Sequence, residues 1–344
     1  MLRPLTERLS GRLEAFEYDS SLLANNPLAD PSLRQHPVYL PPGYDDSDQV
    51  STRYPVLWSL AAYTSAGPAQ VAWRNHGESL PQRLDRLITC GEMPPAVVVF
   101  PDCYTSLGGN QYVNSPALGA YADYLAHELV PAIDARYRTL ASPKSRALFG
   151  KSSGGFGALH LAMHYPQVWS AAASHAGDVG FDRVYLRDFP LCCDVLSRHG
   201  GDLEAFVRHF WRSQRPRHEA FHALMVLCLA ASYSPDPGQS LGLALPFDLR
   251  TCQLDEAVWA RWMAFDPLQQ VQAKADTLQQ MRGLWIDVGS RDQYFIHYGA
   301  RALHDALLAL NVDHHWEEFD GTHSGIDWRY DHSLPWLMSR LIAA

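Results

Sequence analysis

The residues with the clearest chemical potential lie in the segment "RALFGKSSGGFGALH", where Gly150, Ser152 and Gly154 form the pattern G-x-S-x-G. The pattern stands between a short apolar run that predicts a β-strand and a longer run that predicts an α-helix. A serine on a sharp strand-to-helix turn is held above the sheet, and glycines two positions away let strand and helix approach each other. The spacing therefore favours Ser152 as a nucleophile.

Two other interpretations of the same segment compete with a nucleophile. A phosphate-binding loop requires G-x-x-x-x-G-K-[ST], and Lys151 follows Gly150, but Ser145 stands where the first glycine belongs. The nucleotide-binding interpretation is therefore excluded. A glycine-rich turn that only permits close helix packing stays open on this segment alone.

A serine hydroxyl attacks efficiently only when a base takes its proton and a third group orients that base. Asp292 lies in the loop "SRDQYF" after the apolar run "LWIDVG", and His323 lies in the loop "DGTHSG" after "HHWEEF". Asp287 lies inside a strand and Asp320 is only three residues from the histidine, whereas a loop at a strand's carboxyl end can reach across to an imidazole. The sequence therefore predicts a triad of Ser152, Asp292 and His323.

Several other histidines could carry chemistry. His160 and His164 share a helix face, but "HLAMH" lacks the glutamate of the zinc motif H-E-x-x-H, so packing or exposure is the better interpretation. His314 and His315 point to opposite faces of a strand and cannot share one ion. His175, at the end of another strand, is expected to be structural, and no metal site is predicted.

Ester chemistry through a serine also needs two backbone N–H groups that bind the oxyanion of the tetrahedral intermediate. One comes from the residue after the nucleophile and the other from the loop after the third strand. These would be Ser153 and either Ala62 or Tyr63.

The elements that must position these residues alternate between β-type and helical runs, which predicts an α/β protein with a mainly parallel sheet and helices on both faces. We expect one domain over residues 1–344, with a helical cap inserted at residues 179–282, where the strand rhythm disappears. The expected strands are Arg12–Tyr18, His36–Pro41, Tyr54–Ala62, Ala96–Asp102, Arg146–Gly150, Ala171–Gly177, Leu284–Gly289 and His314–Phe319. The expected helices outside the insertion are 121–137, Gly154–His164, Tyr298–Leu310 and Pro335–Ile342, and those inside it are 202–213, 218–233 and 255–265.

Bulk properties exclude several classes of protein. The 344 residues include 47% hydrophobic and 19% charged residues, typical of a globular protein, and the net charge of -9 disfavours nucleic acid and anionic lipid as partners. The opening segment has no apolar core of signal-peptide length, and no later run is long enough to span a membrane. Six cysteines without C-x-x-C spacing predict free thiols in the cytoplasm. A homo-oligomer is compatible with the sequence.

Several stretches together resemble the esterase family of α/β-hydrolases that includes esterase D (S-formylglutathione hydrolase), feruloyl esterases, enterochelin esterase-like hydrolases and mycolyltransferases. The matching stretches run from about residue 36 to 328 and are "YLPPGYDDS", "RYPVLWSL", "VVVFPD", "ELVPAIDARY", "GKSSGGFGALHLAMHYP", "DVGSRDQYF" and "DGTHSGIDW". The resemblance implies an α/β-hydrolase fold, an ester or thioester substrate, no metal and no organic cofactor. It also implies Ser152 as nucleophile, Asp292 as acid and His323 as base.

The chain departs from this family in two places. Where many members carry His-Gly after the third strand, this chain has Ala61-Ala62, and the extra Cβ would affect the conformation of the oxyanion loop. The insertion is also longer than expected of esterase D, which weakens an assignment to formylglutathione.

The segment "PDCYTSLGGNQYVNSP" resembles the loop that lies beside the active site in the family, so Tyr104 and Tyr112, with Asn110 and Gln111, could contact substrate. Large aromatic side chains elsewhere could form an apolar acyl or aryl pocket, although those of the insertion are better explained as its own core. The aromatic candidates are Trp73, Phe295, Phe210, Trp211, Trp259 and Trp262.

The sequence therefore predicts a carboxylesterase-type serine hydrolase that acts on small acyl or aryl esters through an acyl-enzyme. Two alternatives stay open: an acyltransferase with the same triad, and a catalytically inactive binding protein that keeps the fold.

Overall fold

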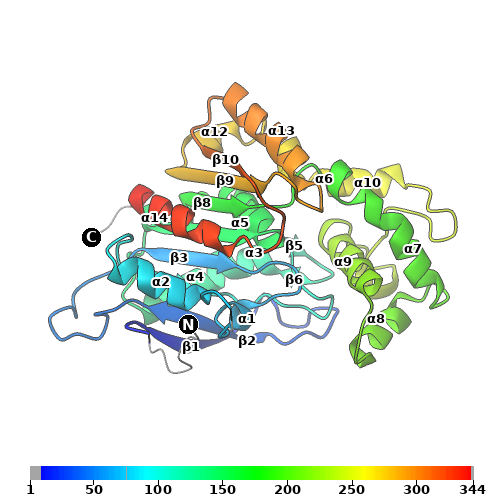
Figure 1. The fold of residues 1–344 in the computed structure, drawn as a ribbon. Helices are drawn as coiled ribbons and strands as arrows, with labels where there is room; N and C mark the ends of the chain where they lie inside the picture. The colour runs from blue at the N-terminus through cyan, green and yellow to red at the C-terminus, as the bar shows by residue number, and fades with distance from the viewer. Residues whose placement is uncertain (1–8, 75, 342–344) are drawn as a thin grey trace.

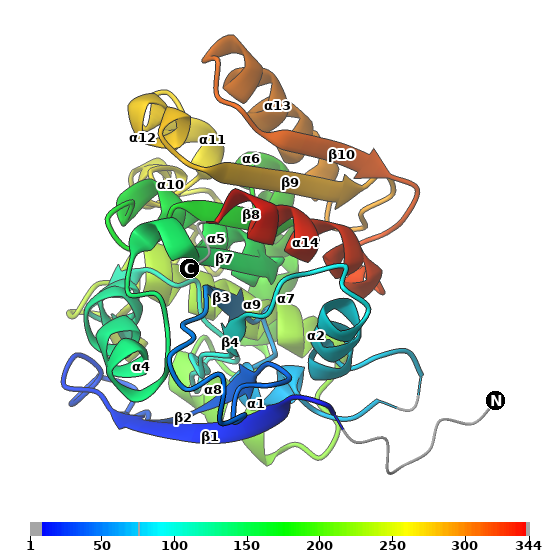
Figure 2. The ribbon, with the colours of Figure 1, turned by 90° about the vertical axis from the view of Figure 1, so that its left-hand side faces the viewer.

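The computed structural model describes residues 9–74 and 76–341, and a twisted eight-stranded sheet forms its centre (Figures 1 and 2). The order of the strands is β1-β2-β4-β3-β7-β8-β9-β10, in which β1 and β2 are antiparallel to their neighbours and the other six are parallel. The strands are β1 (Arg12–Asp19), β2 (Leu33–Leu40), β3 (Val56–Leu60), β4 (Val97–Val99), β7 (Arg146–Lys151), β8 (Ala171–His175), β9 (Gly283–Gly289) and β10 (His315–Phe319). The predicted α/β-hydrolase architecture is confirmed. A separate hairpin pairs β5 (Asn114–Ser115) with β6 (Gly119–Ala120).

Several predicted strands are longer than the strands that form, and β4 and β3 differ most from the prediction. β4 ends at Val99 rather than Asp102, because Pro101 has no N–H to continue the ladder. β3 ends at Leu60 rather than Ala62. The residues after it turn away from the sheet and form the wall of a cavity that is described below.

Helices cover both faces of the sheet, as predicted. Side chains alternate along β7, so that Phe149 packs in one apolar cluster and Leu148 in the other. Figure 2 shows α2 and α14 on one side of the sheet and α4 on the other. The helices outside the insertion are α1 (Gly67–Gln70), α2 (Leu80–Thr89), α3 (Tyr121–Asp123), α4 (Val130–Arg136), α5 (Ser153–His164), α13 (Ile296–Ala309) and α14 (Tyr330–Arg340).

Three helices differ from the sequence expectation. The expected helix 121–137 contains a π-helical turn (Tyr124–Leu129), because Pro131 cannot donate to a carbonyl four residues back, and the N–H of Val130 bonds Leu125 instead. Helix α14 starts at Tyr330, earlier than expected, and the predicted end at Ile342 lies outside the described residues. Helix α2 was not predicted, although the capping box of Ser79 with the residue three positions later marks its start.

The segment between β8 and β9 is helical, and Figure 1 shows its larger helices grouped beside the sheet. It contains α6 (Phe181–Val184), α7 (Phe189–Ser197), α8 (Leu203–Arg212), α9 (His218–Tyr233), α10 (Glu256–Met263), α11 (Pro267–Gln270) and α12 (Ala275–Gln279). The three helices expected in the insertion correspond to α8, α9 and α10. The division into one domain with a cap at residues 179–282 stays a prediction.

Two general observations concern the described residues as a whole. Among them, no helix combines the length and apolar character needed to cross a bilayer. All six cysteines are free thiols.

Candidate active site

Ser152 occupies a strained turn between β7 and α5. Its backbone angles, φ 56° and ψ −126°, lie in a region that non-glycine residues rarely adopt and that costs about 1–3 kcal/mol. A Cβ on Gly150 would lie 2.5 Å from the backbone of Gly154, and a Cβ on Gly154 would lie 2.1 Å from the carbonyl oxygen of Leu60. Only glycine fits at both positions, so the strand and helix can meet at the angle that lifts the serine.

Asp292 and His323 form a buried pair in the loops after β9 and β10. The Nδ1 of His323 lies 2.7 Å from the Oδ2 of Asp292, and the other carboxylate oxygen accepts the N–H of Tyr294 at 2.8 Å. A carboxylate can only accept, so Nδ1 carries the proton and Nε2 keeps its lone pair. The backbone N–H of His323 donates to Gln293 Oε1 at 2.9 Å, which fixes the loop.

Of the three predicted triad residues, Asp292 and His323 are joined by a hydrogen bond, and no hydrogen bond joins Ser152 to His323 within the described residues. Ser152 and His323 line one cavity of about 360 Å³, and Asp292 lies behind the histidine, 2% exposed. The structure thus brings the predicted acid and base into direct contact and places the serine in the wall of the same cavity.

The candidate oxyanion residues Ala62, Tyr63 and Ser153 also line this cavity. Among the described residues, none accepts a hydrogen bond from the backbone N–H of Tyr63 or Ser153. The Ala61-Ala62 sequence causes no strain, because neither residue has a positive φ; the left-handed position of this loop is Thr64, with φ 68°. The effect of the extra Cβ on the oxyanion loop stays a prediction.

The substrate-contacting residues expected from the sequence lie elsewhere. Tyr112 is 2% exposed and supports the loop from beneath, since its hydroxyl donates to the carbonyl oxygen of Ala61 at 2.6 Å. Tyr104 packs edge-on against Trp211 outside the cavity. Trp73 and Phe295 are 46% and 43% exposed and do not line it either. None of these four residues lines the cavity, and their contact with substrate stays a prediction.

The other residues expected to contact substrate bond or pack against other parts of the protein. Gln111 donates from Nε2 to the hydroxyl of Ser153 at 2.9 Å, and Asn110 accepts from the N–H of Tyr112, so both amides stabilise the site from outside. Phe210, Trp259 and Trp262 are buried in the core of the insertion, as the sequence favoured.

The competing acids and histidines do not line the cavity. His175 and Asp287 are joined at 2.8 Å, and the Oγ of Ser333 lies 3.0 Å from the other ring nitrogen, in a fully buried network. The carbonyl of His175 accepts the N–H of Ser152 at 3.0 Å, so this network supports the nucleophile turn. Asp320 is exposed and pairs with Arg291. Within residues 9–74 and 76–341 no group of three or more candidate ligands could hold a metal ion.

Several cavity residues were missed by the sequence reasoning. Lys151 is the last residue of β7, and Asp178 lies in the loop after β8. Both lie at the carboxyl ends of parallel strands, so the rule that located Asp292 could have found them. The insertion contributes residues that no sequence signal marks, because only its packing decides which face they occupy. These residues are Val184, Tyr185, Asp188, His218, Phe221, His222 and Met225.

Asp178 is a second carboxyl group near the catalytic candidates. Burial raises its pKa to about 6, although the hydroxyl of Tyr185, which donates to it at 2.8 Å, and the nearby His323 both favour the charged form. When Asp178 is ionised, its negative charge interacts electrostatically with His323, the histidine that Asp292 orients.

The raised pKa of Asp178 predicts a pH-dependent cost of folding. An unfolded aspartate titrates near about 3.9, so between about pH 4 and pH 6 the folded chain binds more protons and the free energy of unfolding falls as pH rises. Asp178→Asn is therefore expected to stabilise the protein at pH 8 by up to about 3 kcal/mol, and hardly at all at pH 4. Thermal unfolding at both pH values measures this, with Asp305→Asn, an exposed position in α13, as control. An equal gain at both pH values would contradict the assignment.

The parallel sheet, the strained serine after its central strand and the aspartate–histidine pair after the later strands define the class of the α/β-hydrolases. The family model "Esterase: Putative esterase" matches residues 33–333. The chain therefore belongs to this esterase family.

Solved structures with the same fold cover nearly the whole chain. A ferulic acid esterase aligns with a TM-score of 0.60 and 18% identity over 97% of this chain and 100% of its own. The Staphylococcus aureus serine hydrolase FphF aligns with a TM-score of 0.59 and 15% identity, over 95% and 98% of the two chains. An S-formylglutathione hydrolase from Agrobacterium tumefaciens aligns with a TM-score of 0.57 and 18% identity over 97% of each chain. At these identities the likeness shows the fold.

Sequence relatives match a shorter part. Esterase Rv1288 of Mycobacterium tuberculosis is 33% identical over 106 residues, which is 29% of this chain. The match spans only 22% of that relative's length.

Proposed function

We propose that the chain hydrolyses small acyl or aryl carboxylic esters through an acyl-enzyme on Ser152. The observation that carries this proposal is that His323, which lies 2.7 Å from Asp292, lines the same cavity as Ser152. The free thiols favour a reducing compartment, and we place the enzyme in the cytoplasm.

In the first half of the reaction, Nε2 of His323 takes the proton of Ser152 as Oγ attacks the ester carbonyl. The oxyanion is stabilised by the backbone N–H of Ser153 and that of Tyr63 or Ala62. Collapse of the tetrahedral intermediate releases the alcohol, which receives the proton from the imidazolium, and Asp292 stabilises that cation. In the second half, His323 deprotonates water, which attacks the acyl-enzyme and releases the acid.

The proposal is tested by fluorophosphonate labelling combined with hydrolysis of p-nitrophenyl butyrate. We expect the probe to attach to Ser152 and the hydrolysis rate to fall in proportion to the labelled fraction. Hydrolysis by fully labelled protein would contradict the mechanism, and failure to label or hydrolyse would favour an inactive binding protein. Glycerol added during turnover separates hydrolysis, which yields mostly free acid, from acyl transfer, which yields the glycerol ester.

A further inference from the structure

A second, smaller cavity of about 160 Å³ adjoins the first at the nucleophile turn. Only two residues, Ala62 and Lys151, line both cavities within the described part of the chain. Lys151 is the residue directly before Ser152 and the last of β7, so the position of its backbone is fixed by the sheet. Its side chain therefore lies at the junction of the two cavities, beside the proposed reaction site.

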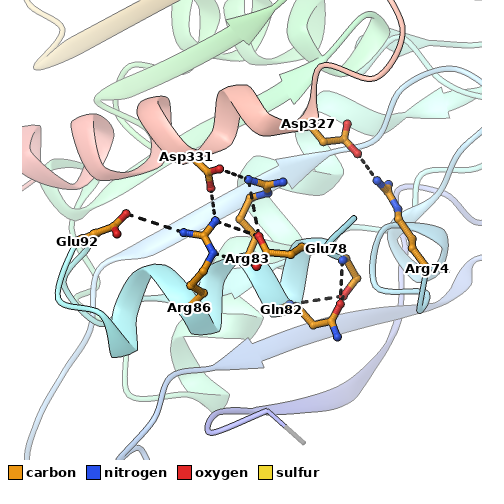
Figure 3. A network of polar contacts seen from close by, with 9 residues as sticks. Arg74, Glu78, Gln82, Arg83, Arg86, Glu92, Asp327 and Asp331 are labelled. Atoms are coloured by element: carbon orange, nitrogen blue, oxygen red, sulfur yellow. Dashed lines mark hydrogen bonds and ion pairs between the residues drawn. The ribbon is translucent and has the colours of Figure 1, made fainter. Parts of the chain in front are cut away.

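The other cations of the second cavity already have partners, as Figure 3 shows. Arg74 pairs with Asp327 at the start of the segment that leads into α14. Arg83 lies 2.5 Å from Asp331, and both groups belong to the network that joins α2 to α14 (Figure 3). These two arginines therefore hold α14 and the segment before it against the helix α2 side of the sheet.

Lys151 differs from these arginines. It forms no ion pair with any described residue, and the carboxylates of Asp327 and Asp292 act on it only at longer range. Burial lowers the pKa of its ammonium group, which shows that the surroundings do not compensate fully for the lost water. A partly buried cation without a counterion is a cost to folding that an anionic ligand would relieve.

The carboxylates in or beside the first cavity have hydrogen-bond or ion-pair partners other than Lys151. Asp292 is paired with His323, and Asp188 lies 3.3 Å from His222. Asp178 accepts the hydroxyl of Tyr185. Each carboxylate therefore already has a partner.

We propose that Lys151 binds a carboxylate group carried by the ester substrate, so that the enzyme prefers anionic esters to neutral ones of the same size. This inference rests on the proposed esterase function and adds the substrate class. The carboxylate would sit at the junction of the two cavities while the ester carbonyl lies at Ser152. It could belong to the acyl part or to the alcohol part of the ester, and the experiment separates these.

The test compares matched pairs of esters that differ by one carboxylate. For the acyl part, the pair is the mono-p-nitrophenyl ester of adipic acid against p-nitrophenyl hexanoate. For the alcohol part, the pair is 4-acetoxybenzoate against 4-acetoxybenzamide. The measured quantity is the ratio of kcat/KM for the anionic ester to that for the neutral ester.

We expect Lys151→Met to lower this ratio by about 10- to 100-fold in one of the two pairs, mainly through KM, which corresponds to losing one hydrogen bond to a charged group. Lys151→Arg should keep most of the preference because it keeps the charge. Lys144→Met is the matched control, since this exposed lysine just before the other end of β7 carries the same charge far from the cavities.

A ratio that changes less than twofold in both pairs, or that falls equally in Lys144→Met, would overturn the proposal. Fluorophosphonate labelling confirms that each variant keeps a folded site. If wild-type protein hydrolyses none of the four esters, the esterase function itself fails, and that outcome is distinct from the loss of a charge preference.

Discussion

Replacing Ser152 with alanine is expected to reduce kcat for p-nitrophenyl butyrate by about 10⁶-fold, the size seen when a serine nucleophile is removed from a triad. The alanine has no oxygen to form the acyl bond, while the residual rate comes from the oxyanion site and substrate binding. Measurements of p-nitrophenol release, over short times for the wild-type protein and over long incubations for the variant, detect a rate difference of this size.

The neighbouring serine provides a comparison for this prediction. Ser153→Ala removes a hydroxyl that accepts from Gln111 but leaves the backbone N–H, so fluorophosphonate labelling should persist in this variant and disappear in Ser152→Ala. Labelling of Ser152→Ala, or turnover within tenfold of wild type, would show that another group attacks the ester.

Asp292→Asn is expected to lower kcat by about 10⁴-fold, because the amide can donate a hydrogen bond to Nδ1 and so favour the tautomer in which Nε2 carries the proton. The substitution is nearly isosteric, and its amide oxygen can still accept the N–H of Tyr294, so the fold should persist. Steady-state kinetics on p-nitrophenyl butyrate measure the effect, with Asp320→Asn as an exposed control that should stay within twofold.

A much smaller effect of Asp292→Asn would point to the second carboxyl group. Asp178 acts electrostatically on His323 and would then be the group that stabilises the imidazolium. In that case Asp178→Asn, rather than Asp292→Asn, should remove most of the activity.

The sequence predicts the site well where chemistry depends on position along a strand. Ser152, Asp292 and His323 each follow a strand of the parallel sheet, and the ends of such strands meet at one edge. Loops after these strands must therefore converge, whatever their detailed conformation. This rule needs only the order of the elements, which alternating apolar runs reveal.

Which residues line the cavity depends on how the helices and loops pack, and the pattern of apolar and polar residues in the sequence does not show this. Tyr112 lies in a stretch that looks like a surface loop, yet it is buried with φ 58° beneath the oxyanion loop. His222 belongs to the long helix α9, and the sequence alone does not show which face of this helix meets the cavity. The sequence marks Lys151 only by its likeness to a phosphate-loop lysine, whereas its position between two cavities depends on the arrangement of α1, α2 and α14.

The buried contact between Ser333 and His175 has a consequence for biosynthesis. The carbonyl of His175 holds the reactive turn, while its ring is held by groups that the ribosome adds much later, the last of them in α14. The nascent polypeptide therefore cannot complete the support of Ser152 until α14 has left the ribosomal exit tunnel.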